Sequence, residues 1–138
     1  MDPARIFFPM IALAGLTFSV LMLIPIARLR AVRSGMLEAD DFKFGESSRV
    51  PPHVSIPNRN YMSLLELPIL FYAVCLALFV THRVDHAAVL LAWLYVALRL
   101  GHSLIHLTYN RVLHRLVFFG ASNIVLSVIW VRFLLALA

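Results

Sequence analysis

Four long apolar stretches alternate with polar segments along the chain. An α-helix rises 1.5 Å per residue, so about 20 apolar residues cross the roughly 30 Å of hydrocarbon in a bilayer. Each of the four stretches reaches that length, although arginines interrupt the third and the fourth. The pattern predicts four membrane-spanning helices, at residues 6–27, 61–80, 86–107 and 112–137.

The only long polar segment, residues 28–60, separates the first two stretches. It contains Gly35, Gly45 and prolines at positions 51, 52 and 57, which favour turns over a long helix. We expect an ordered loop with one short helical turn. No internal repeat or low-complexity segment divides the chain, so a single domain over residues 1–138 is expected. The predicted fold is all-α, an integral membrane four-helix bundle.

The composition agrees with a membrane protein. Of the 138 residues, 62% are hydrophobic and 14% are charged, whereas soluble domains average about 45–50% apolar and about 25% charged residues. The net charge of +5 is therefore interpreted as a feature of membrane topology, and no nucleic-acid partner is expected. The single Cys75 excludes a disulfide within the chain. The first apolar stretch follows Asp2 and has no small-residue cleavage site, so we expect a retained helix rather than a signal peptide.

Lysines and arginines are unevenly divided between the two ends of the predicted helices. Eight lie in or beside the 28–60 loop and the 108–112 turn, and three lie at the other end, when Arg99 inside the third helix is left out. Positive residues concentrate on the cytoplasmic side of membrane proteins. The loop and the turn are therefore predicted to be cytoplasmic, with both termini on the opposite side.

Polar side chains from all four predicted helices gather near the cytoplasmic ends. Two sets have the spacing of a single helical face, Arg59, Ser63 and Glu66 in the second helix and Arg99, His102 and His106 in the third. The first helix ends near Arg28 and Arg30, and the fourth begins with Arg111 and Arg115. Ionisable groups at membrane depth are costly and mark candidate functional sites.

Two interpretations of these groups stay open. Arg28, Arg30 and Arg111 could extend to lipid headgroups as ordinary flanking residues. Glu66 could form a buried ion pair with an arginine of the third or fourth helix, and the two histidines could hydrogen-bond between helices. However, one carboxylate cannot neutralise four arginines, so the surplus positive charge favours a bound polyanionic ligand.

A metal site is a further alternative. His102 and His106 have the i, i+4 spacing that can chelate one ion, and Glu66 could add a carboxylate. The arginines around them would repel a divalent cation, and His82 and His86 show the same spacing on the opposite face. We therefore expect no metal.

Two segments carry a family resemblance: RNYMSLLELPILFYAVCLAL (59–78) and WLYVALRLGHSLIHLTYNRVLHRLVFFGASNIVL (93–126). They combine an acidic residue before a proline in the second helix, an Arg-x-x-His motif in the third and paired arginines at the start of the fourth. In these features the chain resembles the MAPEG family, the membrane-associated proteins in eicosanoid and glutathione metabolism, and its bacterial members most closely. The resemblance is strong over about residues 59–130. In the first span and the loop that follows it, only the order of the elements is similar.

The resemblance implies a homotrimer of four-helix protomers in a bacterial inner membrane, with glutathione held between neighbouring protomers near the cytoplasmic face. Matched motif by motif, Glu66 contacts the glutathione amino group and Arg115 activates the thiol. The other glutathione-binding residues implied by the comparison are Arg28, Arg59, Ser63, Arg99, His102, His106 and Arg111.

Three positions depart from the family pattern. Ser63 stands in place of the usual asparagine, and His106 and Phe119 stand in place of tyrosines found in the glutathione-binding enzymes. Ser63 keeps a short polar group, but Phe119 cannot donate a hydrogen bond. These changes support an anion pocket more firmly than a catalyst.

Two functions follow from these observations. The leading hypothesis is a glutathione-dependent transferase or peroxidase acting on lipophilic small molecules that enter from the membrane lipids. Arg115 would stabilise the thiolate, while the other arginines and Glu66 would hold the glutathione carboxylates and ammonium group. The alternative is a non-catalytic membrane scaffold or lipid-binding subunit that keeps the MAPEG fold. A homo-oligomer also agrees with the shortage of acidic side chains in that leaflet, which contacts or a ligand shared between protomers would relieve.

Overall fold

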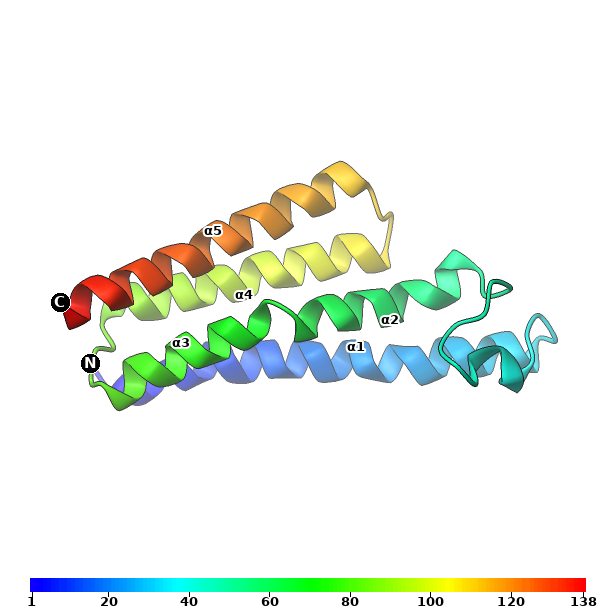
Figure 1. Ribbon diagram of the computed structural model, residues 1–138, viewed down its shortest axis with the longest axis horizontal. Helices are drawn as coiled ribbons and strands as arrows, with labels where there is room; N and C mark the ends of the chain where they lie inside the picture. The colour runs from blue at the N-terminus through cyan, green and yellow to red at the C-terminus, as the bar shows by residue number, and fades with distance from the viewer.

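The computed structural model describes all residues, 1–138, and forms a helical bundle with no β-strand (Figure 1). The predicted all-α fold is therefore confirmed. The elements are two short 3₁₀-helices, η1 (Pro3–Ile6) and η2 (Ala39–Phe42), and five α-helices, α1 (Phe7–Arg33), α2 (Pro52–Leu65), α3 (Pro68–Val80), α4 (His86–Leu107) and α5 (Val112–Leu137). Both termini lie at one end of the bundle, and the segment between α1 and α2 lies at the other (Figure 1).

Four helical segments are long and apolar enough to cross a membrane: Pro3–Arg33, Pro52–Val80, His86–Leu107 and Val112–Leu137. The third and fourth coincide with the stretches delimited by the hydrophobic pattern. The first is longer than expected at both ends. The second begins at Pro52 rather than at Tyr61, because a proline in the first turn of a helix loses no hydrogen bond and has a suitable φ.

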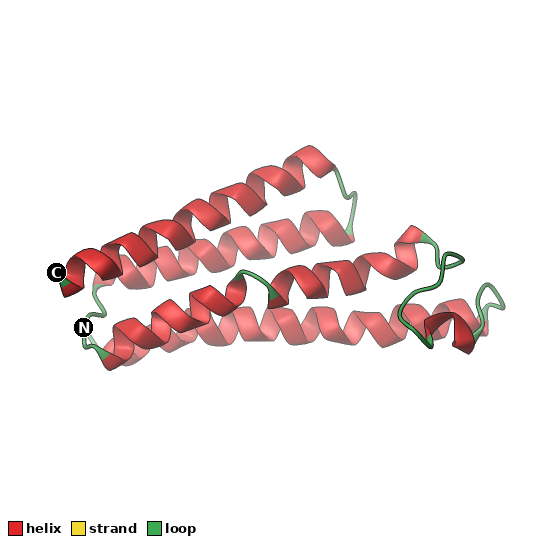
Figure 2. Cartoon of the chain, viewed as in Figure 1, coloured by secondary structure: helices red, strands yellow, loops and turns green.

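The second span is broken between α2 and α3, where the hydrophobic pattern predicted one continuous helix. Pro68 has no amide hydrogen, and its ring collides with the carbonyl four residues earlier, so a regular helix cannot pass through it. α2 ends at Leu65, Glu66 turns the backbone with ψ −101°, and α3 begins with Pro68. Figure 2 shows the interruption as a short loop within the span.

The segment between α1 and α2 covers residues 34–51 and is shorter than the 28–60 loop expected, since both flanking helices extend into it. Gly35 and Gly45 adopt φ values of +74° and +95°, which glycine tolerates without steric cost. The segment folds back on α1, because the amides of Met36 and Leu37 both donate to the carbonyl of Ala31.

Asp41 organises the middle of this segment. Its carboxylate accepts hydrogen bonds from the Glu38 amide (2.9 Å) and the Ser47 hydroxyl (2.8 Å), and lies 3.7 Å from the Arg49 guanidinium. The hydrogen bond from the Glu38 amide lowers the pKa of Asp41 the most, and the Ser47 hydroxyl and the Arg49 guanidinium lower it further. The ionised carboxylate therefore holds the segment in its fold.

The interior of the bundle is divided into an apolar half and a polar half. In the half that carries the termini, Phe71 of α3 stacks on Tyr95 of α4 with ring centroids 4.6 Å apart. Apart from Ser122 near the middle of α5, the buried polar side chains lie instead toward the loop end: Ser55, Asn60, Arg99, His102, Ser103 and His106. Since burial of polar groups costs free energy unless they find partners, this polar half is where a functional site is expected.

Candidate functional site

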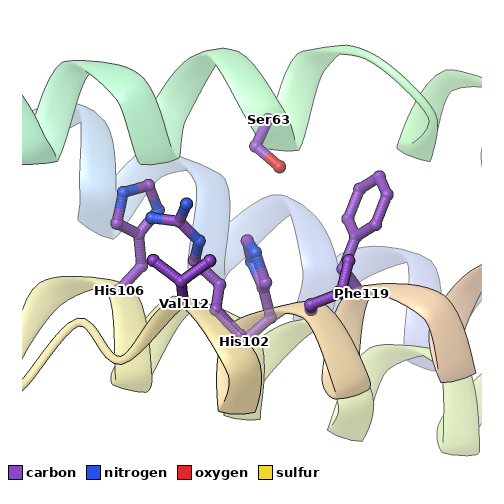
Figure 3. A pocket seen from close by; sticks show the side chains of 7 residues that line it. Ser63, His102, His106, Val112 and Phe119 are labelled. Carbon is purple, nitrogen blue, oxygen red and sulfur yellow. The ribbon is translucent and has the colours of Figure 1, made fainter.

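A cavity with a polar wall lies between α2, α4 and α5, toward the loop end of the bundle. Its volume is about 270 Å³. Ser63 projects into it from α2, and His102, His106 and Phe119 project toward Ser63 from the opposite side (Figure 3). The remaining lining residues are Val112, Arg115 and Leu116 of α5. Ser63, His102, His106 and Arg115, which the sequence assigned to one site, thus line one cavity.

A second cavity, of about 250 Å³, adjoins the first through His106 and Arg115, which line both. Arg59 of α2 and Asn110 of the α4–α5 turn contribute its polar wall, and Pro52 and Ile56 its apolar wall. No carboxylate lines either cavity. The two cavities together form a cationic site, and Arg115 stands where they meet.

Arg99 lies behind the first cavity and is fully buried. Its Nη2 donates to the backbone carbonyl of Ser63 (2.6 Å) and to the Ser63 hydroxyl (3.0 Å). Its guanidinium carbon lies 5.8 Å from the centroid of the Phe119 ring, within the range of a cation–π contact. Its Nε and Nη1 atoms are buried and have no hydrogen-bond partner within the protomer.

The contact with Ser63 has a local cause. The last carbonyls of a helix lack amide donors from a following turn, and Pro68 removes one more donor beyond the end of α2. A guanidinium at a helix C-terminus supplies hydrogen bonds and a favourable charge. Arg99 therefore caps α2 at the break, a role that the helical spacing alone did not reveal.

The two histidines of α4 stand side by side in the cavity wall. His102 and His106 are 4% and 6% exposed, and their ring centroids are 5.8 Å apart. His102 also lies 5.9 Å from the Phe119 ring. The structure places no cluster of three histidine, cysteine or carboxylate side chains here. The rings can act as hydrogen-bond donors or acceptors toward a ligand.

Arg115 is held by a residue that the sequence analysis did not single out. Its Nη1 donates to the Asn110 side-chain oxygen (2.8 Å). Asn110 has φ +48°, a left-handed conformation that asparagine adopts more readily than most residues, and its amide donates to the Ile105 carbonyl (2.8 Å). The sequence offered one sign that Asn110 could hold Arg115, namely an asparagine within the predicted 108–112 turn.

Asn60 and Ser103 form a second polar contact that the sequence analysis did not identify. Both are fully or almost fully buried, and the Ser103 hydroxyl donates to the Asn60 side-chain oxygen (3.2 Å). The bond joins α2 to α4 near Arg99. Asn60 lies three residues before Ser63 and Ser103 four residues after Arg99, so helical spacing could have found both.

A family match covers almost the whole chain. The model of the MAPEG family matches residues 6–135. The chain belongs to the MAPEG family. No curated protein and no solved structure matches it. MAPEG membership and the four candidate spans make it a multi-pass integral membrane protein, in a family that generally includes glutathione-related membrane enzymes.

Besides Arg99, which stands behind the first cavity, three of the residues that the MAPEG resemblance implied lie outside the paired cavities. Glu66 is exposed at the break between α2 and α3 and belongs to none of the ion pairs of the protomer. The ion pair between Glu66 and an arginine of α4 or α5, which the sequence left open as an alternative, therefore does not form within this MAPEG protomer. Arg111 is exposed at the N-terminus of α5.

Arg28 is the third of these residues, and it faces the 34–51 segment. Its Nη2 lies 3.6 Å from the Glu46 carboxylate, and its guanidinium carbon lies 4.8 Å from the centroid of the Phe42 ring. Both partners lie in the segment between α1 and α2, whose fold could not be read from helical spacing. Within the protomer, Arg28 therefore holds that segment against α1.

Proposed function

We propose that this MAPEG protein binds glutathione and acts as a glutathione transferase or peroxidase on lipophilic electrophiles. The observation that carries the proposal is the position of Arg115, which lines two adjoining cavities whose walls contain no carboxylate. A guanidinium held inside a protein, where the effective dielectric constant is lower than in water, stabilises an anion more strongly than it does in water.

The side chains of the paired cavities fit the charges of glutathione, which carries two carboxylates, an ammonium group and a thiol. Arg59 and Arg115 can donate charge-assisted hydrogen bonds to the carboxylates or the sulfur. Arg99 lies behind the first cavity and supports its wall by holding Ser63. The cavities of about 270 and 250 Å³ together fall in the range typical of small-molecule sites, roughly 300–1,000 Å³.

The ammonium group of glutathione needs an acid, which the paired cavities do not contain. Glu66 is the acid that the family comparison implies, and it lies on the outside of the protomer. An acid in that position is free to meet a ligand shared with a neighbouring protomer, as in the homotrimer that the family resemblance implies. Arg28 and Arg111 would contribute to the site in the same way, from beyond the cavities of their own protomer.

The chemistry rests on Arg115. When bound, glutathione supplies a thiol that can add to an electrophile or reduce a hydroperoxide. Arg115 stabilises the anionic form of a sulfur placed beside it. Asn110 fixes the direction of the guanidinium through the 2.8 Å hydrogen bond, and the Phe119 ring helps to exclude water from the cavity.

A third cavity supplies a route for lipophilic substrates. It measures about 390 Å³ and is lined by Leu67 and Leu70 of α3 and by Asn123, Leu126, Ser127, Trp130 and Val131 of α5. Asn123 follows Phe119 by one helical turn, so this mainly apolar cavity continues along the same face of α5 as the first. An electrophile dissolved in the bilayer could approach Arg115 along that face.

The test is an activity assay on the purified protein in detergent. We expect glutathione conjugation to chlorodinitrobenzene, or reduction of cumene hydroperoxide, above the rate in buffer. Arg115→Ala should lower that rate by about 100-fold, the typical loss when a transition-state charge loses its donor. Arg132→Ala is the matched control, since Arg132 lies on the same helix and pairs with Asp85 at the opposite end. Equal rates for wild type and Arg115→Ala would refute the enzymatic role.

A second candidate function is a non-catalytic membrane scaffold or lipid-binding subunit. Phe119 favours it, because this ring occupies the cavity wall without a hydroxyl, and the Ser63 hydroxyl already accepts a bond from Arg99. Native mass spectrometry separates the two functions. Glutathione bound at millimolar concentration supports the enzyme, whereas a retained phospholipid without glutathione binding supports the scaffold.

The proposed orientation places the 34–51 segment and the α4–α5 turn in the cytoplasm of a bacterium, with the protein in the inner membrane. The paired cavities are lined by residues of the α4–α5 turn and of the adjoining ends of α4 and α5, and this turn lies at the same end of the bundle as the 34–51 segment (Figure 1). Glutathione, a cytoplasmic solute, would then reach Arg115 without crossing the membrane. Proteolysis of inside-out vesicles tests this, because cleavage within residues 34–51 should occur there and not in intact cells.

A further inference from the structure

A separate cationic cavity lies between the end of α1 and the start of α2. Its volume is about 400 Å³, and its lining residues are Ala27, Arg30, Ala31, Ser34, Met36, His53 and Val54. None of them lines the paired cavities around Arg115. We call it the α1–α2 cavity.

The basic side chains of the α1–α2 cavity have no ion-pair partner in the protomer. Arg30 and His53 take part in no ion pair, and no carboxylate lines the cavity. Arg28 lies in the same turn of α1 as Arg30 but differs from it, because Arg28 is paired with Glu46 of the 34–51 segment. The unpaired guanidinium of Arg30 therefore favours an anionic ligand for the cavity.

The cavity is a built feature and not a gap between mobile side chains. Ala31 and Val54 form its floor and are buried together with Leu37 in a small apolar cluster. The backbone of residues 36 and 37 is hydrogen-bonded to the carbonyl of Ala31, which fixes Met36 beside α1. Because α1 and α2 are held together by this cluster, Arg30 and His53 have fixed points of attachment.

Below Arg30, toward the middle of the membrane span, α1 presents an exposed apolar face. Ile26 and Leu23 precede Arg30 by one and two helical turns and so lie on the same face. They are 43% and 38% exposed. A ligand with an anionic head between Arg30 and His53 and a hydrocarbon chain along Ile26 and Leu23 would match both parts of this surface.

We propose that the α1–α2 cavity binds the headgroup of an anionic phospholipid. The phosphodiester would accept hydrogen bonds from the Arg30 guanidinium and the His53 imidazole, and one acyl chain would lie along Leu23 and Ile26. Basic pockets between membrane helices at the cytoplasmic face are suited to such headgroups. The site is distinct from the glutathione site and does not depend on it.

The test is a lipid titration of detergent-purified protein followed by native mass spectrometry. Wild type should bind phosphatidylglycerol at least about tenfold more tightly than phosphatidylcholine with the same acyl chains, the gain expected from charge-assisted hydrogen bonds. The double variant Arg30→Gln/His53→Gln should lose this preference, while Arg30→Lys should keep part of it. Arg33→Gln is the matched control, because Arg33 is exposed on the same helix end but does not line the cavity.

A thermal unfolding measurement covers the case in which a variant is poorly folded. Without lipid, the double variant should unfold at the wild-type temperature, since both side chains are exposed. Added phosphatidylglycerol should then raise the unfolding temperature of wild type and of Arg33→Gln, but not that of the double variant. An equal loss in Arg33→Gln, equal binding of phosphatidylcholine, or an equal effect of inorganic phosphate alone would overturn the proposal.

Discussion

Arg99 of α4 joins α2 by donating two hydrogen bonds from one nitrogen, to the Ser63 carbonyl at 2.6 Å and to the Ser63 hydroxyl at 3.0 Å. The carbonyl lies in the last turn of α2, just before the break at Pro68. The wall of the first cavity is therefore built on a capped helix end, and the geometry of Ser63 depends on Arg99.

The first prediction separates the two bonds of Arg99. Arg99→Ala leaves the part-buried Ser63 carbonyl without its donor and should destabilise the protein by about 1–3 kcal/mol for that group alone. Ser63→Ala removes only the longer bond and keeps the carbonyl capped, so it should cost less. Unfolding of both variants in detergent, followed by circular dichroism, measures the difference. An Arg99→Ala protein as stable as Ser63→Ala would contradict the capping role.

The second prediction concerns the turn before α5. Asn110→Gly keeps the left-handed conformation, which glycine adopts freely, but removes the acceptor that holds Arg115. We expect an unchanged unfolding temperature and a loss of about tenfold in kcat/KM for glutathione conjugation, the effect of one hydrogen bond to a charged group. If Asn110→Gly matches wild type in kcat/KM, Arg115 does not need this partner.

The third prediction tests the close approach of α4 and α5. A Cβ at Gly101 would collide with the Phe118 ring, so Gly101→Ala should destabilise the bundle by about 1–3 kcal/mol through overpacking. Gly120→Ala is the control, because no atom lies within 4 Å of its Cβ position. Alanine is about 0.5–1 kcal/mol better than glycine inside a helix, so Gly120→Ala should be neutral or stabilising. Similar destabilisation of both variants would show that the helices do not meet at Gly101 as described.

The fourth prediction concerns the 34–51 segment and pH. Because hydrogen bonds and Arg49 lower the pKa of Asp41, the ionised carboxylate stabilises the fold of the segment. This contribution is fully present above about pH 4, the ordinary range of an aspartate, and is lost as the pH falls through the lowered value. Amide hydrogen exchange of residues 38–47 should therefore accelerate, after correction for intrinsic rates, when the pH is lowered below that range. Asp41→Asn should show the faster exchange at neutral pH, and an unaffected exchange rate would exclude this role.

The sequence predicted the helical spans where length and hydrophobicity decide the structure. α4 and α5 coincide with their apolar stretches because polar turns with charged residues bound α4 at both ends and α5 at its start. The break in the second span was missed, since Leu64, Leu65 and Leu67 continue the apolar pattern through it. Proline is tolerated in membrane helices, so Pro68 alone did not decide between a kink and an interruption.

Helical spacing predicted which residues of the candidate site lie together wherever the helix is regular. His102 and His106 share a face of α4, and the structure places both in the same cavity wall. The spacing from Arg59 to Glu66 assumed an unbroken helix, but α2 ends at Leu65, and Glu66 is exposed at the break and forms no ion pair. Arg28 turns toward partners in the 34–51 segment, whose fold depends on tertiary contacts and not on periodicity.

The most direct test of the central claim is a density map of the protein purified and imaged with glutathione in the membrane or in detergent. We predict glutathione density in the paired cavities, with carboxylates near Arg59 and the sulfur beside Arg115, and with Glu66 of a neighbouring protomer at the ammonium group. Phospholipid headgroup density in those cavities, or glutathione bound away from Arg115, would contradict the claim.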